Sequence, residues 1–246
     1  MYKEIVSTSS PMDVQTKHYT YTQNPTYSER YDSNLLYYKI MPTVKELEED
    51  IAFVKEKQKS YTSDYVHLSF PENQDLPEEI RQKLEDLSFE ISMEAILILN
   101  EQKADFSKES PLDIELEPLT EKWLEPYFER LDQDVKEYGE LYGQQVRQFV
   151  SEIMLNNEIL LAIYQGKIIG EVTLHFSEEY IEIDNFMVDE TYQGQGVGSL
   201  LQREVLKRKK SNQKVILIVE KDASVYEMYR KQGYEEVASY SECYQS

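Results

Sequence analysis

The sequence predicts an α/β protein with a mixed (α+β) sheet, built from two consecutive regions. Three observations support this prediction. Residues 159–188 contain three apolar segments separated by short turns, which is typical of antiparallel strands. Residues 193–219 contain a glycine-rich loop, an amphipathic stretch at helical spacing and an apolar strand. The small and polar segment ADFSKESP, residues 104–111, separates these elements from an earlier periodic region.

The first region, residues 1–108, is predicted to have the order β-α-β-α-β. Apolar runs indicate its strands, and amphipathic acidic stretches indicate its helices. The expected elements are a strand at 34–40, a helix at 43–57, a strand at 65–70, a helix at 77–87 and a strand at 89–99. The tyrosine-rich segment 19–38 is expected to pack between domains or to line a pocket.

The second region, residues 109–246, is predicted to have the order β-α-α-β-β-β-α-β-α-β. The expected elements are a strand at 112–116, a helix beginning at Thr120, a helix at 144–155, strands at 159–164, 167–176 and 180–188, a helix at 197–210, a strand at 215–219, a helix at 223–232 and a strand at 234–244. Alternation in the second of the three consecutive strands predicts one buried face, formed by Ile168, Gly170, Val172, Leu174 and Phe176. The basic run at 207–210 is expected to complement the carbonyl end of its helix rather than to bind a phosphate.

The composition limits the classes of partner. The chain has 246 residues, enough for one large or two modest domains, and a formal net charge of −21. Such an acidic surface repels phosphate backbones and anionic lipids, so we expect neither nucleic acid nor a membrane as a partner. The same charge favours the approach of a cationic substrate such as an amine, although acidity more often serves solubility.

Cysteine and histidine usage points to a metal-free cytoplasmic protein. Cys243 is the single cysteine, so no internal disulfide can form. The N-terminus has no apolar signal core, and no run of 18 or more apolar residues occurs. His18, His67 and His175 lie far apart without the spacing of metal ligands.

The loop Gln193-Gly194-Gln195-Gly196-Val197-Gly198 lies between a predicted strand and a predicted helix. Glycines let the backbone approach a ligand closely, and the first turn of a helix presents unpaired N–H groups to it. An anion is therefore the expected guest, and a phosphate above all. The spacing fits neither a dinucleotide fingerprint, since Ser199 stands in the sixth place, nor a P-loop.

Residues 188–198, VDETYQGQGVG, closely resemble the Arg/Gln-x-x-Gly-x-Gly/Ala signature of the GNAT N-acetyltransferase superfamily, with Gln193, Gly196 and Gly198 in its three fixed places. The resemblance covers residues 112–246, because the predicted element order is the one that this family uses. Residues 225–234 are similar to the family's closing pattern, an aromatic helix that ends at Gly-Tyr. The first region repeats part of this order without a glycine loop, and so resembles a truncated, degenerate GNAT-like domain.

The resemblance implies acetyl-CoA as co-substrate, a primary amine of a small molecule or protein as acceptor, and no metal. It assigns the cofactor to backbone groups of Phe186, Met187 and Val188 and to the loop residues Gln193, Gly194, Gln195, Gly196, Val197 and Gly198. Asp222 is a further candidate for cofactor binding. It stands where the family often has an asparagine that contacts the pantetheine arm, so the sequence departs from the family pattern there.

Acyl transfer to an amine requires a neutral amine and protonation of the leaving thiolate. On the strand that ends at Val188, alternation is predicted to place Glu182, Asp184, Phe186 and Val188 on one face. The resemblance implies Glu182 as general base, directly or through water, with Asp184 as the alternative. Tyr229 is the candidate acid that protonates the sulfur.

Several alternatives stay open. Tyr226 is a second candidate for the acid. A non-catalytic acyl-CoA-binding sensor would keep the loop and lack turnover. A tandem GNAT-fold aminoacyl transferase would use aminoacyl-tRNA, and the intact loop and the acidic charge argue against it. A homodimer is compatible with the favoured function.

Overall fold

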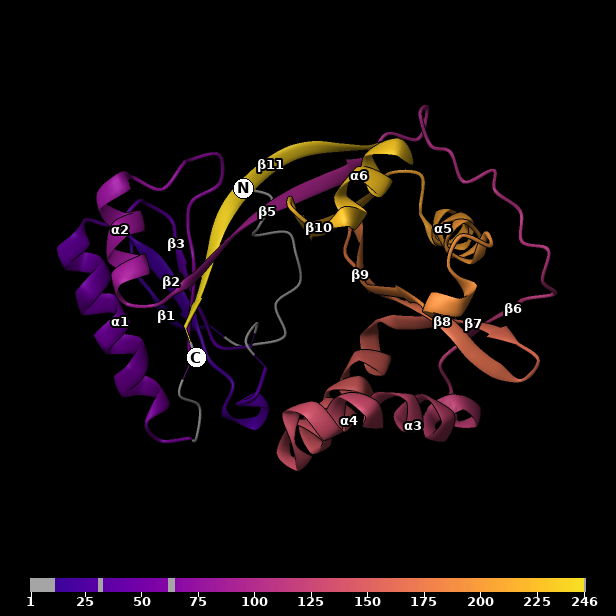
Figure 1. The fold of residues 1–246 in the computed structure, drawn as a ribbon, viewed down its shortest axis with the longest axis horizontal. Coiled ribbons are helices and arrows are strands. Elements are labelled where there is room, and N and C mark those ends of the chain that lie inside the picture. The colour runs from indigo at the N-terminus through magenta and orange to yellow at the C-terminus, as the bar shows by residue number, and fades with distance from the viewer. Residues whose placement is uncertain (1–11, 31–32, 62–64, 246) are drawn as a thin grey trace. The chain divides into compact units, whose positions relative to one another are not determined.

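The computed structural model describes residues 12–30, 33–61 and 65–245 (Figure 1). The chain forms two compact units: the first comprises Met1–Ile96, Val219–Ala223 and Val237–Ser246, and the second comprises Leu97–Ile218 and Ser224–Glu236. Strands β5 (Glu90–Leu99) and β11 (Tyr234–Gln245) have residues in both units. The division of the chain into residues 1–108 and 109–246 stays a prediction.

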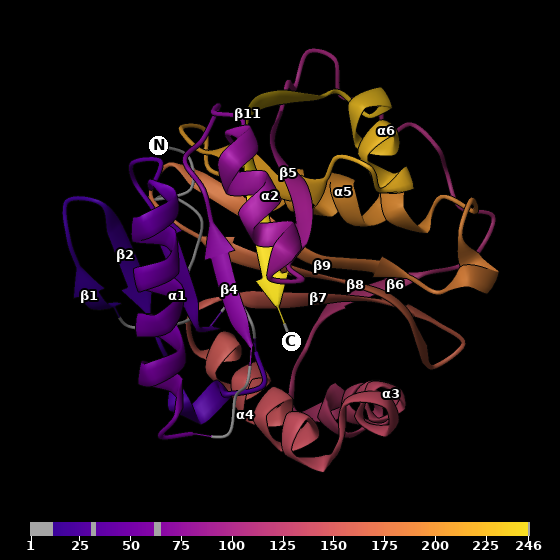
Figure 2. The ribbon, with the colours of Figure 1, turned by 60° about the vertical axis from the view of Figure 1, so that its left-hand side comes forward.

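The first unit has strands in the order β1-β2-β3-β4-β11-β5. Strands β3 and β4 are parallel, whereas β1 with β2, β2 with β3 and β4 with β11 are antiparallel. Helices α1 and α2 lie side by side against these strands (Figure 2). The elements not yet given are β1 (Met12–Gln15), β2 (Tyr19–Thr22), β3 (Leu35–Tyr38), α1 (Val44–Gln58), β4 (Val66–Ser69) and α2 (Glu78–Asp86).

Local chemistry explains why α1 begins where it does. Thr43 and Glu46 form a capping box, in which the Glu46 carboxylate accepts from the Thr43 N–H at 2.8 Å and the Thr43 hydroxyl accepts from the Glu46 N–H at 3.3 Å. Leu47, Ile51 and Val54 follow at helical spacing and are buried in the core of the first unit. The helix therefore has both a start signal and an apolar face.

The predicted β-α-β-α-β order of the first region is confirmed by β3, α1, β4, α2 and β5. Strands β1 and β2 were not predicted, because their segments are short and rich in polar residues and tyrosine. Residues 87–90 (LSFE) and 232–235 (QGYE) are similar in sequence, and the similarity extends to the backbone. Ser88 (φ +62°) precedes β5, and Gly233 (φ +97°) precedes β11, so a left-handed residue ends the preceding helix in each case.

The second unit has strands in the order β5-β10-β9-β8-β7-β6. Strands β9 and β10 are parallel, and β6 to β9 form an antiparallel meander. Its remaining elements are β6 (Glu115–Pro118), α3 (Glu121–Tyr138), α4 (Glu140–Asn156), β7 (Glu158–Tyr164), β8 (Lys167–Phe176), β9 (Tyr180–Val188), α5 (Val197–Arg208), β10 (Lys214–Glu220) and α6 (Ser224–Lys231). The element order predicted for the second region is confirmed.

Helices cover both faces of the meander. Helices α3 and α4 lie on one side of β7, β8 and β9, and α5 lies on the other side (Figure 1). Strand β8 is therefore buried on both faces: Ile169, Glu171 and Thr173 are buried, whereas Phe176 is 39% exposed. The predicted buried face is confirmed at Val172 and Leu174 and is wrong at Phe176, and α3 buries the second face as well. Within the described ranges, no helix is long and apolar enough to cross a membrane.

Candidate functional site

The glycine loop joins the end of β9 to α5 through a short 3-10 helix, Glu190–Tyr192. Gly194 (φ +70°) and Gly196 (φ +83°) both have left-handed backbone conformations, and Gly196 is the N-cap residue of α5. The first turn of α5 has no earlier helical carbonyls to accept from its N–H groups. The loop thus presents backbone donors at the positive end of the helix dipole.

Gln193 fastens this loop to the end of β9. Its side-chain amide donates to the Val188 carbonyl at 3.0 Å, and its backbone N–H donates to the Asp189 carbonyl at 3.1 Å. Gln195 makes a similar local bond, from its side-chain amide to the Thr191 carbonyl at 2.8 Å. The side chains of both glutamines thus bond to backbone carbonyls close to the loop.

Gly196 has a second reason to be glycine. A Cβ atom there would lie 2.7 Å from the Glu109 carbonyl and 2.8 Å from the Ser110 nitrogen. Residues 104–111, the segment interpreted from sequence as a boundary, run against α5, and Arg203 of α5 donates to the carbonyls of Phe106 and Lys108. We call residues 104–111 the linker strap. No local pattern of residues signals this packing.

Strand β9 pairs with β10 only in its first half. It pairs with β10 from Tyr180 to Ile183, and it pairs with β8 up to Val188. Within the described pairing, residues 184–188 therefore have a strand partner on one side only. The candidate backbone groups of Phe186, Met187 and Val188 lie in this half.

A bulge in β9 changes which side chains share a face. Asp184 pairs with Thr173 and Met187 pairs with Glu171, so β9 has one extra residue there, and Asn185 adopts φ +44°. The prediction that Phe186 and Val188 share a face with Glu182 and Asp184 is therefore wrong for the residues after the bulge. Val188 lies opposite Gly170, on the other face.

The two base candidates share a face as predicted, because Glu182 pairs with His175 and Asp184 pairs with Thr173. Glu171 belongs to the same face, and it contacts α3 through Tyr127 and Arg130. Asp184 lies 3.3 Å from the His175 Nε2 atom and is 56% exposed. Its other carboxylate oxygen accepts from the Asn185 N–H at 2.8 Å. The base candidates therefore lie on the α3 side of the sheet.

The acid candidate Tyr229 lies on the opposite side. The Phe186 ring is 6.4 Å from the Tyr229 ring, and it is 3.5 Å from the place of a Cβ on Gly198 of α5. Tyr229 is 7% exposed, and burial raises its pKa to about 12. The Tyr226 hydroxyl donates to Glu236 at 2.6 Å, and this hydrogen bond is the main reason that its pKa is raised. Tyr226 is therefore tied to a carboxylate, whereas Tyr229 is enclosed by rings.

Sequence reasoning missed Glu171. It is fully buried in β8, and its Oε1 atom accepts from the Tyr127 hydroxyl at 3.1 Å and from the Asn185 side-chain amide at 2.6 Å. Arg130 lies 3.4 Å from Oε2 and also pairs with Asp189. Burial raises the pKa of Glu171, and the nearby Arg130 charge offsets this only in part. A charged residue between apolar neighbours in a strand was the available signal.

Asp222 lies in the turn between β10 and α6, two residues before the helix begins. Its proposed contact with the cofactor stays a prediction. Among the residues that the structure describes, no group of three or more His, Cys, Asp or Glu side chains is placed to hold a metal ion.

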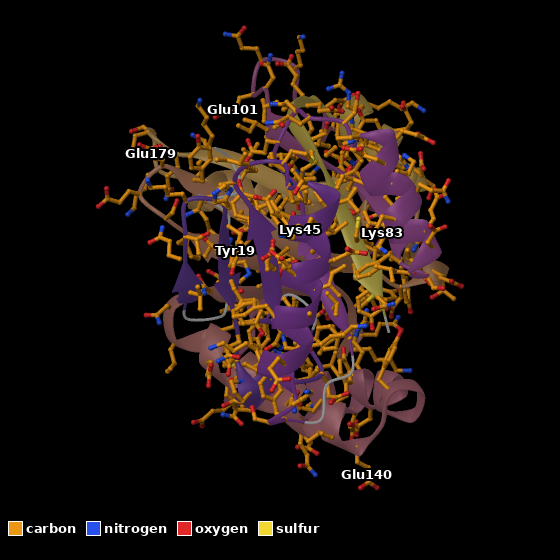
Figure 3. All side chains as sticks on the ribbon, turned by 90° about the vertical axis from the view of Figure 1, so that its left-hand side faces the viewer. Tyr19, Lys45, Lys83, Glu101, Glu140 and Glu179 are labelled. Carbon is orange, nitrogen blue, oxygen red and sulfur yellow. The ribbon has the colours of Figure 1, made fainter. Side chains whose placement is uncertain are left out.

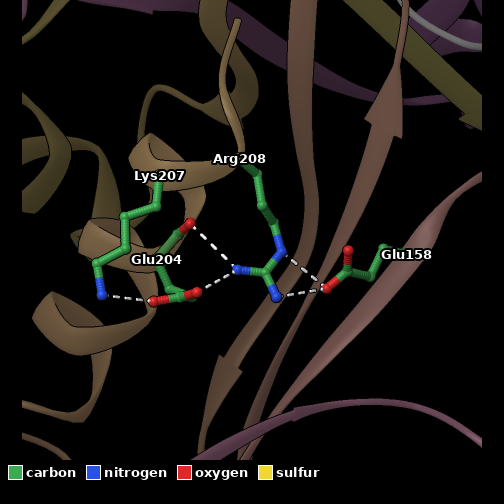
Figure 4. Close-up of polar contacts among 4 residues, drawn as sticks. All are labelled: Glu158, Glu204, Lys207 and Arg208. Atoms are coloured by element: carbon green, nitrogen blue, oxygen red, sulfur yellow. Dashed lines mark hydrogen bonds and ion pairs between the residues drawn. The ribbon is translucent and has the colours of Figure 1, made fainter.

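Acidic side chains form ion pairs with the basic residues at the C-terminal end of α5 (Figure 4). Arg208 contacts one oxygen of Glu158 through Nε at 2.8 Å and Nη2 at 2.7 Å. Its Nη1 atom contacts the Glu204 carboxylate at 2.6 Å and donates to the Glu204 carbonyl at 3.3 Å, while Lys207 contacts Glu204 at 2.9 Å. This part of the basic run thus serves the end of the helix, as expected from the sequence.

Comparison with family models gives two matches. Residues 156–236 match the acetyltransferase (GNAT) domain, and residues 1–96 match a domain of unknown function (DUF5613). A comparison with curated proteins found no match. The first match confirms the resemblance inferred from the glycine loop.

Solved structures share the fold. A functionally unknown conserved protein from Staphylococcus epidermidis has a TM-score of 0.88 and 24% identity, with 100% of this chain and 97% of that chain covered. A GCN5-related N-acetyltransferase from Sphaerobacter thermophilus has a TM-score of 0.65 and 13% identity, with 100% and 85% covered. A tandem GNAT protein from the clavulanic acid biosynthesis pathway has a TM-score of 0.56 and 12% identity, with 86% and 74% covered. These similarities confirm the fold class, a GNAT fold preceded by a smaller GNAT-like domain.

Proposed function

The chain contains an acetyltransferase (GNAT) domain at residues 156–236, and on this premise we propose that it is an N-acetyltransferase that uses acetyl-CoA and a primary amine. The observation that carries the proposal is the placement of the glycine loop. Left-handed Gly194 and Gly196 open the N-terminus of α5 next to the half of β9 that has left β10. A diphosphate and an extended pantetheine arm need these two features side by side.

The loop suits the diphosphate of coenzyme A. The N–H groups at the start of α5 and the helix dipole attract an anion without a basic side chain. This matters in a chain with a net charge of −21, whose general field repels anions. Backbone groups of Gly194, Gly196, Val197 and Gly198 would hold the diphosphate, while Gln193 and Gln195 keep the loop in shape.

The exposed edge of β9 suits the thioester arm. Backbone N–H and C=O groups of Phe186, Met187 and Val188 on the β10 side would pair with the amides of the arm, as a further strand would. A backbone N–H there also suits the thioester oxygen, which gains negative charge as the amine attacks. The departure of β9 from β10 after Ile183 leaves room for such pairing.

Two residues divide the proton transfers. The amine nitrogen attacks the thioester carbon, the carbon–sulfur bond breaks, the amine proton passes to Glu182 directly or through water, and Tyr229 gives its proton to the sulfur. Asp184 is the alternative base. Burial favours Tyr229 in its protonated form, which is the form that an acid needs. Carboxylates on the α3 side also suit a cationic acceptor.

The test is release of free thiol from acetyl-CoA across a panel of primary amines. With a substrate found, Tyr229→Phe should lower kcat about 10²-fold or more, since a phenyl ring cannot protonate the sulfur. Tyr226→Phe is the matched control and should keep kcat within a few fold. Unchanged turnover in Tyr229→Phe would remove that residue from the acid role.

The base is assigned by a second pair of variants. Glu182→Gln and Asp184→Asn keep the size of each side chain and remove its charge. The variant that lacks the base should need a higher pH for the same kcat/KM, because the amine must then lose its proton unaided. If the protein binds acetyl-CoA but releases no thiol with any amine, the result would favour the alternative function, a non-catalytic acyl-CoA-binding sensor.

A further inference from the structure

A cavity lies within the first unit, in the region that matches a domain of unknown function. It has a volume of about 160 Å³. Strand β2, the residues around β3 and one face of α1 form its wall. The lining residues are Thr16, His18, Tyr19, Tyr38, Ile40, Pro42, Glu46 and Asp50.

Two aromatic rings are fixed in this wall. Tyr19 and Tyr38 meet edge to face, with ring centroids 6.4 Å apart. Phe70 stacks on Tyr38 at 5.2 Å, and Phe53 of α1 lies 6.1 Å from Tyr19, which Figure 3 shows beside α1. Because neighbours hold both rings, the cavity offers preformed aromatic surface.

Two carboxylates face the same cavity. Glu46 and Asp50 are one helical turn apart on α1, so their side chains share a face. Glu46 uses one oxygen in the capping box with Thr43. Burial raises the pKa of Asp50. Among the described lining residues none is lysine or arginine, and His18 is the one basic side chain.

The Tyr38 hydroxyl adds a buried polar group. Tyr38 is 1% exposed, and its hydroxyl lies beside the Asp50 carboxylate and hydrogen-bonds to it. Burial, and after it the charge of Asp50, raise the pKa of the Tyr38 hydroxyl. A buried hydroxyl and a partly buried carboxylate thus lie at one cavity, where the two carboxylates outnumber the one basic side chain among the described lining residues, His18.

We propose that this cavity binds a small organic ammonium ion, whose charged group contacts Asp50 and whose alkyl part lies against Tyr19 and Tyr38. A cation relieves the cost of holding a carboxylate away from water, and the tyrosine rings offer apolar surface to its alkyl part. Glu46 and Asp50 repel an anion. A neutral apolar guest would displace water from Asp50 without offsetting its charge. The site does not depend on the proposed acyl transfer.

The test is an NMR titration of the full chain with propylammonium chloride, near pH 8. Sodium chloride at equal concentration controls for ionic strength, and 1-propanol is the neutral analogue. Saturable shifts centred on Tyr19, Tyr38 and Asp50 are expected with propylammonium alone. No saturable shift, or equal binding of 1-propanol, would overturn the proposal on the unaltered protein.

A matched pair of variants then tests the carboxylate. Asp50→Asn should weaken propylammonium binding at least about tenfold, because the charge-assisted contact is lost. Glu49→Gln changes the charge equally on the neighbouring residue, which pairs with Lys45 outside the cavity, and should leave the affinity unchanged. Equal affinity of Asp50→Asn and the original chain would refute the assignment. If Asp50→Asn does not fold, Tyr19→Leu replaces it and should weaken binding several fold, whereas unchanged binding would refute the aromatic contact.

Discussion

Replacing Gly196 with alanine tests whether close packing against the linker strap requires a glycine at this position, apart from any ligand. At φ +83° an L-residue costs about 1–2 kcal/mol. The new Cβ would lie 2.7 Å from the Glu109 carbonyl, which is backbone and cannot rotate away. Overpacking of this kind costs about 1–3 kcal/mol more. Gly196→Ala should therefore lower the free energy of unfolding by about 2–5 kcal/mol.

The other two loop glycines are matched controls. Gly194 has φ +70°, and no atom lies within 4 Å of the place that its Cβ would take, so Gly194→Ala should cost about 1–2 kcal/mol from the backbone alone. Gly198 lies in α5, and its Cβ would meet the Phe186 ring at 3.5 Å, an ordinary contact. Gly198→Ala should be neutral or stabilising by up to about 1 kcal/mol.

Urea unfolding followed by fluorescence measures these differences. Trp123 is the single tryptophan and is buried in α3, so its emission reports on the unit that contains the loop. At equal m-values, the shift in midpoint gives the change in stability. If Gly196→Ala lowers the free energy of unfolding no more than Gly194→Ala does, close packing of the linker strap does not require a glycine at position 196. Acetyl-CoA binding is then better tested with Gly194→Ala, which leaves the strap in place.

Two further predictions concern buried and half-buried charges. Burial raises the pKa of Glu171 above its unfolded value, so the stability that its proton confers is fully present below the unfolded pKa and is lost as the pH rises through the folded pKa. Glu171→Gln has no such proton. As the pH falls, the free energy of unfolding of the original chain should therefore rise relative to that of the variant, by about 1.4 kcal/mol per unit by which the pKa is raised. A relative fall in stability on acidification would contradict this. Arg208→Lys should cost about 0.5–1 kcal/mol in urea unfolding, because an ammonium cannot keep the contacts with both Glu158 and Glu204, and high salt should shrink the difference. A cost that is independent of salt would point to packing instead.

Element order was predictable because it follows from local patterns. Strand periodicity and tight turns predicted the meander, and helical spacing after Gly198 predicted α5. The capping box at Thr43 and the glycine before Tyr234 set helix ends through neighbouring residues alone. The glycine loop was recognisable for the same reason, because the glycines that its left-handed backbone requires are close together in the sequence.

The missed features depend on contacts between residues far apart in sequence. Glu109 presses on Gly196, and Glu171 receives hydrogen bonds from Tyr127 and Asn185, each at least 14 residues away. A periodicity argument treats each strand separately, so it cannot detect a residue inserted in one strand relative to its neighbour. The bulge at Asn185 is such an insertion, and it is why the predicted face of β9 failed after Asp184.

That single extra residue matters for the proposed chemistry. Before the bulge, Glu182 and Asp184 face the α3 side; after it, Phe186 faces α5 and Tyr229. A thioester held by the backbone after the bulge would receive its amine from the side of the carboxylates and release sulfur toward the phenol. In a strand without the bulge, Asp184 and Phe186 would share one face, and the attacking and leaving groups would compete for the same side. In the proposed mechanism the bulge thus lets one strand serve base and acid on opposite faces, and the hydrogen bond from Asn185 to Glu171 stabilises the bulge.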